Sequence, residues 1–73
     1  MNKLELLRTF VRVTELSSFT GAGESLGLPR STVSEHVQAL EELLGARLLQ
    51  RTTRKVQATQ DGLVLYERSK DLL

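Results

Sequence analysis

Apolar side chains recur at spacings of three and four residues in four segments of the chain, a pattern that predicts amphipathic helices. These segments cover about residues 3–16, 19–26 and 31–44, and a fourth begins at Thr59. The fold predicted from them is mainly α-helical. The side chains expected to face its core are Leu4, Leu6, Leu7, Phe10 (or Val11), Val13 and Thr14, then Phe19, Ala22 and Leu26, then Val33, Val37, Leu40 and Leu44, and finally Gly62, Leu65 (or Tyr66), Ser69 and Leu72 (or Leu73).

Residues that cap or end helices separate these segments. Ser17 or Ser18 can accept a hydrogen bond from a backbone N–H group at the start of the second helix, and Thr59 can do the same for the fourth. Gly27 and Gly45 are placed to end the second and third helices, because glycine adopts the left-handed conformation at little cost. The short links predict a compact packing of the first three helices.

Residues 47–58 have a different pattern. Leu48 and Leu49 form one short apolar pair, and Val56 with Ala58 forms another at a spacing of two residues. The residues between the two pairs, 50–55, are all polar or basic. This pattern predicts a two-stranded hairpin whose tip carries positive charge.

Composition limits the chain to one small domain. It has 73 residues, of which 40% are hydrophobic, enough for a single core. Ten basic residues nearly balance nine acidic ones, but the segment 46–60 holds Arg47, Arg51, Arg54 and Lys55 and no acidic residue. Such a cluster can bind an anion or can be a solvated loop, and composition does not decide between these interpretations.

Several function classes are excluded by residues that the sequence lacks. The chain has no cysteine and a single histidine, His36, so neither a disulfide scaffold nor a zinc site of cysteine or histidine clusters is possible. We expect His36 to be a partly exposed surface residue. There is no nucleophile–base pair, phosphate loop, long apolar span or secretory leader, so we predict a cytoplasmic, non-enzymatic domain without a cofactor or a membrane partner.

Residues 19–38 have the spacing of a helix-turn-helix. Small residues at Ala22 and Gly23 would let two helices cross closely, Gly27 would make the turn between them, and Leu28 with Val33 would fill the space between them. The polar side chains at the start of the second helix would then project outward. They are all of a length suited to base edges and phosphates: Arg30, Ser31, Thr32, Ser34, Glu35 and Gln38.

The sequence resembles the N-terminal domain of LysR-type transcriptional regulators. The resemblance is carried by residues 19–26, 31–34 and 40–52, supported by Leu7, Phe10 and Val13 and by the start of the last helix at 59–62. Its most specific part is the run Leu-Glu-x-x-Leu-Gly-x-x-Leu-x-x-Arg that begins at Leu40 and ends at Arg51. The match extends over nearly the whole chain in order.

The resemblance implies a winged helix-turn-helix with a three-helix core and a two-stranded wing over residues 1–58. Residues 59–73 would be the start of a linker helix that pairs two subunits. The helix from about 31 to 44 would enter the major groove of double-stranded DNA, and the basic wing at 51–55 would contact the backbone or the minor groove. Complete family members carry a further C-terminal domain that binds a small-molecule effector, which these 73 residues do not contain.

The resemblance also implies partners and sites. We expect a bacterial homodimer, or a higher oligomer in the full-length protein, on an interrupted palindromic operator in the nucleoid. The residues expected to contact DNA are Ser18, Thr20, Arg30, Ser31, Thr32, Ser34, Glu35, Gln38, Arg51, Thr53, Arg54 and Lys55. Those expected at the dimer contact are Leu65, Tyr66, Leu72 and Leu73.

Three residues depart from the family pattern. Pro29 stands where serine is common, so the usual helix cap is lost, and Ser31 would replace it with a shift of one or two residues in the helix start. Glu35 stands where a basic residue is usual. It cannot bind guanine or phosphate, but it can accept from a cytosine amino group or repel wrong sites. Gly23 replaces an alanine, which keeps the close helix contact at some cost in helix stability.

Two alternatives stay open from the sequence. Arg51 can contact phosphate, or it can brace the wing against Glu41 or Glu42, which otherwise look like surface or hinge charges. The same fold can also dock a protein through the third helix or the wing. The acidic residues of the third helix favour a docking module slightly, whereas the basic wing, which lacks acidic residues, favours DNA.

Overall fold

A computed structural model describes residues 2–51 and 55–72, and it has the predicted order of elements. Four helices, α1 (Lys3–Leu16), α2 (Phe19–Leu26), α3 (Arg30–Leu44) and α4 (Gln60–Ser69), accompany a hairpin of β1 (Leu49–Arg51) and β2 (Val56–Ala58). The strands are antiparallel and pair Leu49 with Ala58 and Arg51 with Val56. The architecture is that of a winged helix-turn-helix.

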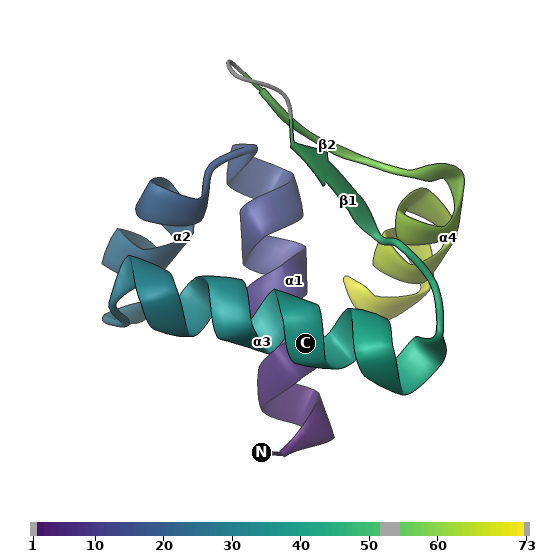
Figure 1. The fold of residues 1–73 in the computed structure, drawn as a ribbon, viewed down its shortest axis with the longest axis horizontal. Coiled ribbons are helices and arrows are strands. Elements are labelled where there is room, and N and C mark those ends of the chain that lie inside the picture. The colour runs from purple at the N-terminus through teal and green to yellow at the C-terminus, as the bar shows by residue number, and fades with distance from the viewer. Residues whose placement is uncertain (1, 52–54, 73) are drawn as a thin grey trace.

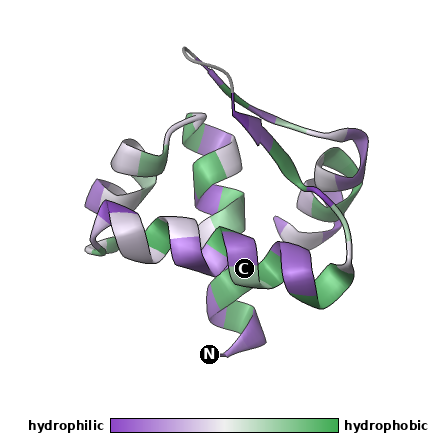
Figure 2. Cartoon of the chain, viewed as in Figure 1, coloured by the Kyte–Doolittle hydropathy of each residue, from purple (hydrophilic) through white to green (hydrophobic). Residues whose placement is uncertain are grey.

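Helix α1 is the centre of the packing. It contacts α2, α3 and α4, while α3 crosses in front of it and the hairpin lies above α3, between α1 and α4, in this view (Figure 1). Helices α2 and α4 lie on opposite sides of α1 in this view. Hydrophobic and hydrophilic residues alternate along the helices and strands (Figure 2), and the first three helices contribute buried residues to one shared core.

The core consists of one connected set of apolar side chains. Its most deeply buried members come from α1, α2 and α3 and from the two residues at the start of the hairpin: Phe10, Val13, Phe19, Ala22, Val33, Val37, Leu40, Leu48 and Leu49. Leu7, Leu28, Leu65 and Tyr66 are half-buried and pack against this set. The helical periodicity of the sequence thus identified most of the core.

The predicted helix ends are largely confirmed. The Ser18 hydroxyl accepts from the backbone N–H of Gly21, and the Thr59 hydroxyl accepts from that of Gly62. Gly27 and Gly45 end α2 and α3 with φ angles of +71° and +65°, in the left-handed region where a side chain is unfavourable. Ser17 does not cap α2; it ends α1 with a φ of +50°.

Three predicted core positions are wrong. Leu4 is 56% exposed, because it lies in the first turn of α1, which extends past α3 (Figure 1). Leu44 is 49% exposed, because it is the last residue of α3. Leu72 is 75% exposed, because α4 ends at Ser69 and its apolar side is not continued.

His36 is buried, contrary to the expectation that it lies at the surface. Its ring is on the side of α3 that faces α1, and its Nδ1 lies 2.8 Å from the hydroxyl oxygen of Thr9. Its position three residues after Val33 and four before Leu40 places it beside two core residues of the same helix. We expected His36 at the surface because histidine is polar, although its spacing from Val33 and Leu40 is that of a core residue.

Candidate nucleic-acid interface

Helix α3 has three faces of different character. Val33, His36, Val37 and Leu40 point into the protein, whereas the exposed side chains Ser31, Glu35, Gln38 and Glu42 follow each other at spacings of three and four residues. A third set, Arg30, Ser34 and Glu41, lies between the two, on the side toward the hairpin. The predicted contact residues are thus divided between an outer face and a flank that touches the wing.

The start of α3 differs from the prediction. Pro29 occupies the N-cap position with φ −62° and ψ 149° and forms no side-chain cap. Its carbonyl oxygen accepts from the backbone N–H groups of Thr32 and Val33, so the helix begins at Arg30. Ser31 lies inside the first turn, where it is exposed, and does not replace the cap. Because the fixed φ of proline already suits a helix start, no shift in the start is needed.

Glu41 attaches the wing to α3. One of its carboxylate oxygens, Oε2, accepts from the backbone N–H groups of Leu48 and Leu49 at 2.8 Å and 3.3 Å. Both donors belong to the segment that enters β1. Glu41 therefore holds the point where the hairpin leaves the helical core. The sequence indicated a surface or hinge charge at Glu41 but not these two backbone contacts.

Arg51 connects the wing to both helices of the helix-turn-helix. Its Nη2 donates to the Ser34 hydroxyl oxygen at 3.0 Å, and its guanidinium carbon lies 4.2 Å from the centre of the Phe19 ring. Arg30 approaches the same ring at 5.8 Å. In the part of the chain that the structure describes, Arg51 forms no ion pair with Glu41 or Glu42. Arg51 does brace the wing, but it does so against Ser34 and Phe19.

The remaining predicted contact residues lie at several places in the fold and differ in exposure. Thr20 is exposed on α2, Thr32 is half-buried on α3, and Lys55 is exposed directly before β2. Ser18 is half-buried and its hydroxyl is engaged as the cap of α2. Thr53 and Arg54 lie outside the described residues.

A family model described as bacterial regulatory helix-turn-helix protein, lysR family, matches residues 4–63. The chain belongs to the LysR family. A related sequence is the uncharacterized HTH-type transcriptional regulator YhjC of Escherichia coli K12, which is 47% identical over all 73 residues. The chain spans 24% of the length of that regulator, and it spans about a quarter of the other relatives that match it over its full length.

Solved structures of LysR-family domains superimpose on the chain. The BenM DNA-binding domain in complex with catB site 1 DNA has a TM-score of 0.92 at 40% identity, over 99% of this chain and 79% of that one. The CbnR DNA-binding domain in complex with DNA has a TM-score of 0.91 at 28% identity, over 99% of this chain and 82% of that one. The winged helix-turn-helix of this LysR-family chain is therefore shared with domains crystallised on DNA.

Helix α4 of this LysR-family domain presents apolar side chains that the sequence analysis did not select. Leu65 and Tyr66 are half-buried against the core of their own chain, whereas Leu63 and Val64 are about half exposed. Leu73 lies outside the described residues. At the end of the helix, a hydrogen bond from Lys70 to Glu67 at 2.8 Å, together with their opposite charges, raises the pKa of Lys70.

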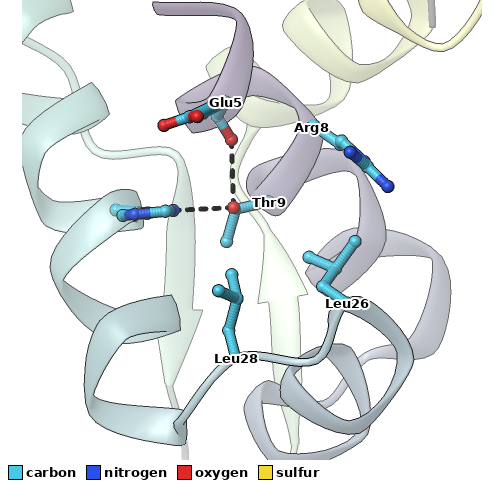
Figure 3. Close-up of a pocket in the computed structure, with 6 residues that line it drawn as sticks. Glu5, Arg8, Thr9, Leu26 and Leu28 are labelled. Carbon is cyan, nitrogen blue, oxygen red and sulfur yellow. Dashed lines mark hydrogen bonds between the residues drawn. The ribbon is translucent and has the colours of Figure 1, made fainter. Parts of the chain in front are cut away.

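A small pocket lies between α1 and α3 of this LysR-family domain. It is lined by Glu5, Arg8 and Thr9 of α1, by Leu26 at the end of α2 and Leu28 of the turn, and by His36 of α3 (Figure 3). The Thr9 hydroxyl donates to the backbone carbonyl of Glu5 at 3.0 Å and also meets His36. Over the described ranges, no group of three or more metal-ligating side chains occurs, and no helix is long and apolar enough to cross a membrane.

Proposed function

We propose that this chain is the sequence-specific DNA-binding domain of a LysR-type transcriptional regulator. Residues 1–58 would form the DNA-binding unit and residues 59–73 the start of the linker helix. The observation that carries the proposal is the outer face of α3, a row of exposed hydrogen-bonding side chains next to Arg51 at the end of β1. The two related domains crystallised on DNA support it.

In this proposal α3 lies in the major groove. Ser31, Ser34, Glu35 and Gln38 would face base edges, and Arg30 would contact the backbone near the start of the helix. The acidic Glu35 would select a cytosine amino group or exclude other bases. The wing at 51–55 would follow the phosphates or the minor groove, and Arg54 would make the contact to them. These contacts would be made by a regulator without catalytic activity in the bacterial cytoplasm.

Two copies would bind one operator through symmetric half-sites. Leu63, Val64 and Leu72 are the exposed apolar residues of α4 and the turn after it, and they would contribute to the contact between subunits. Leu65 and Tyr66 would support that helix from inside rather than make the contact themselves. Any effector would act through a separate domain of the regulator.

Binding to labelled duplexes, measured by fluorescence anisotropy, tests the proposal. A preferred duplex is first selected from a random pool and then compared with an unrelated duplex at several salt concentrations. Arg54→Ala should weaken binding to both duplexes about equally and reduce the salt slope by about one. Ser34→Ala should act mainly on the preferred duplex.

Glu67→Ala serves as the control, because Glu67 is exposed on α4 and is not part of the outer face of α3. It should change neither affinity by more than about twofold. If the folded wild-type chain binds no duplex at low salt, the proposed function is wrong.

A further inference from the structure

The contact between Arg51 and Ser34 joins two parts of the interface that are 17 residues apart in the sequence. A guanidinium group has five N–H donors and no acceptor, so the Ser34 oxygen must be the acceptor in this contact. The Ser34 proton therefore points to some other group. Among the described residues, the Ser34 hydroxyl donates to no acceptor within the chain.

The guanidinium group of Arg51 also contacts the ring of Phe19. The guanidinium carbon lies 4.2 Å from the centre of the Phe19 ring, within the range of a cation–π contact. Phe19 is only 3% exposed, so the ring is a fixed surface of the core. Because the planar guanidinium is held by a ring and a hydrogen bond together, its orientation toward Ser34 is constrained.

We propose that Arg51 is a positioning residue for sequence readout, acting through Ser34 rather than through the phosphates. By donating to the Ser34 oxygen, Arg51 orients the hydroxyl proton outward and makes it a stronger donor. Ser34 then reads a hydrogen-bond acceptor in the major groove, such as purine N7, guanine O6 or thymine O4. This inference rests on the proposed DNA-binding function and assigns the wing a part in specificity.

Arg30 is a useful comparison with Arg51 within the same domain. It approaches the same Phe19 ring at 5.8 Å, but no hydrogen bond ties it to another described side chain. It is exposed at the start of α3, where a phosphate contact needs no rearrangement. We expect Arg30 to contribute to affinity for all duplexes and Arg51 to contribute to discrimination between them.

The first experiment uses the free protein and needs no DNA. The ring current of Phe19 should shift the Arg51 side-chain proton resonances upfield, and Phe19→Leu should return them to ordinary values. If the Arg51 resonances are ordinary in the wild type and do not change in Phe19→Leu, the contact is absent in solution and the proposal is overturned. This result would not affect the proposed function.

The second experiment compares a selected duplex with single-base-pair variants of it. Ser34→Ala, Arg51→Ala and Arg51→Lys should each reduce discrimination at the same base pair, on the order of tenfold. The double variant of Ser34→Ala with Arg51→Ala should lose no more than either single variant, because both remove one coupled contact. Arg51→Lys is decisive, because it keeps the charge but loses the planar group.

The salt dependence separates positioning from a phosphate contact. Arg30→Ala should lower the salt slope by about one, whereas Arg51→Lys should leave it unchanged. Arg47→Lys is the matched control in the same basic segment. The Arg47 side chain donates to the backbone carbonyl of Leu49 rather than to a side chain of α3, so this change should affect neither quantity. Circular dichroism of each variant confirms that it is folded.

The proposal is overturned if Arg51→Lys keeps wild-type discrimination, or if the losses from Ser34→Ala and Arg51→Ala add. It is also overturned if Arg51→Ala weakens all duplexes equally. If the wild type binds no duplex, the proposed function fails and this inference fails with it, even where the free-protein spectra confirm the contact with Phe19.

Discussion

His36 and Thr9 form a buried polar contact between the recognition helix and the central helix, with 2.8 Å between Nδ1 and the hydroxyl oxygen. The Thr9 hydroxyl proton is donated to the carbonyl oxygen of Glu5. With its own proton donated to Glu5, the Thr9 oxygen can only accept in this contact, so Nδ1 of His36 is the donor. The contact joins α3 to α1 inside the core.

Thr9→Val should destabilise the fold, because it removes the hydroxyl without changing the shape of the side chain and leaves the buried His36 donor unpaired. The expected loss in the free energy of unfolding is about 1–3 kcal/mol, measured by urea denaturation. Thr14→Val is the matched control, since Thr14 makes the same bond to its own helix, to the carbonyl of Phe10, and is less buried. It should change the free energy of unfolding by less than about 0.5 kcal/mol. Equal losses for the two variants would contradict the account of His36.

Glu41→Ala should loosen the wing, because two backbone N–H groups at the start of β1 lose their acceptor. We expect a loss of about 1–3 kcal/mol in the free energy of unfolding and faster amide hydrogen exchange at Leu48 and Leu49. Glu42→Ala, at the exposed neighbouring position, should have little effect on either measurement. Unchanged exchange at Leu48 in Glu41→Ala would show that this carboxylate does not hold the wing.

Gly62→Ala should be strongly destabilising, because a Cβ atom there would overlap the backbone carbonyl oxygen of Leu48. That oxygen is already fixed by the N–H of Thr59 at 2.9 Å, so it cannot move without breaking the start of α4. The expected loss is about 1–3 kcal/mol by thermal or urea unfolding. At Gly21 a Cβ atom would meet side-chain atoms rather than backbone, with Ser18 at 3.2 Å and Leu16 at 3.7 Å. A loss in Gly21→Ala as large as that in Gly62→Ala would count against a close approach specific to α4.

Leu63→Lys together with Val64→Lys should lower self-association if the exposed side of α4 forms the subunit contact. Sedimentation velocity at increasing protein concentration would detect the change. Leu43→Lys, at an equally exposed position on α3, is the control and should leave the association unchanged. An unaltered association in the α4 double variant would place the subunit contact elsewhere.

The local spacing of apolar and capping residues was enough to predict the helices and strands and most of the core. Val33, Val37 and Leu40 repeat at helical spacing and are buried, and Thr59 caps the helix that follows it. The wrong core positions have a common cause. Periodicity shows which side of a helix is apolar, but it does not show how far along the helix that side is covered. Leu4 and Leu44 have the right spacing but lie in the end turns of their helices, where no neighbouring element covers them.

The sequence predicted which residues of the candidate site are exposed, but not the contacts between its side chains. Arg30, Ser31, Glu35 and Gln38 are exposed on α3 as expected. The contacts of Arg51 with Ser34 and Phe19 depend on where the end of β1 meets α2 and α3 in the folded chain, and no spacing in the sequence encodes that approach. The one available signal for His36 was its position between Val33 and Leu40 on the inner side of α3.

The most direct test of the central claim is a residue-resolved NMR titration of the chain with an arbitrary DNA duplex at low salt. The account predicts amide shifts concentrated at residues 30–38 and 51–55 that fade as salt is added, with α4 largely unchanged. A folded protein whose spectrum does not change with DNA, or changes only at α4, would contradict DNA binding through α3 and the wing.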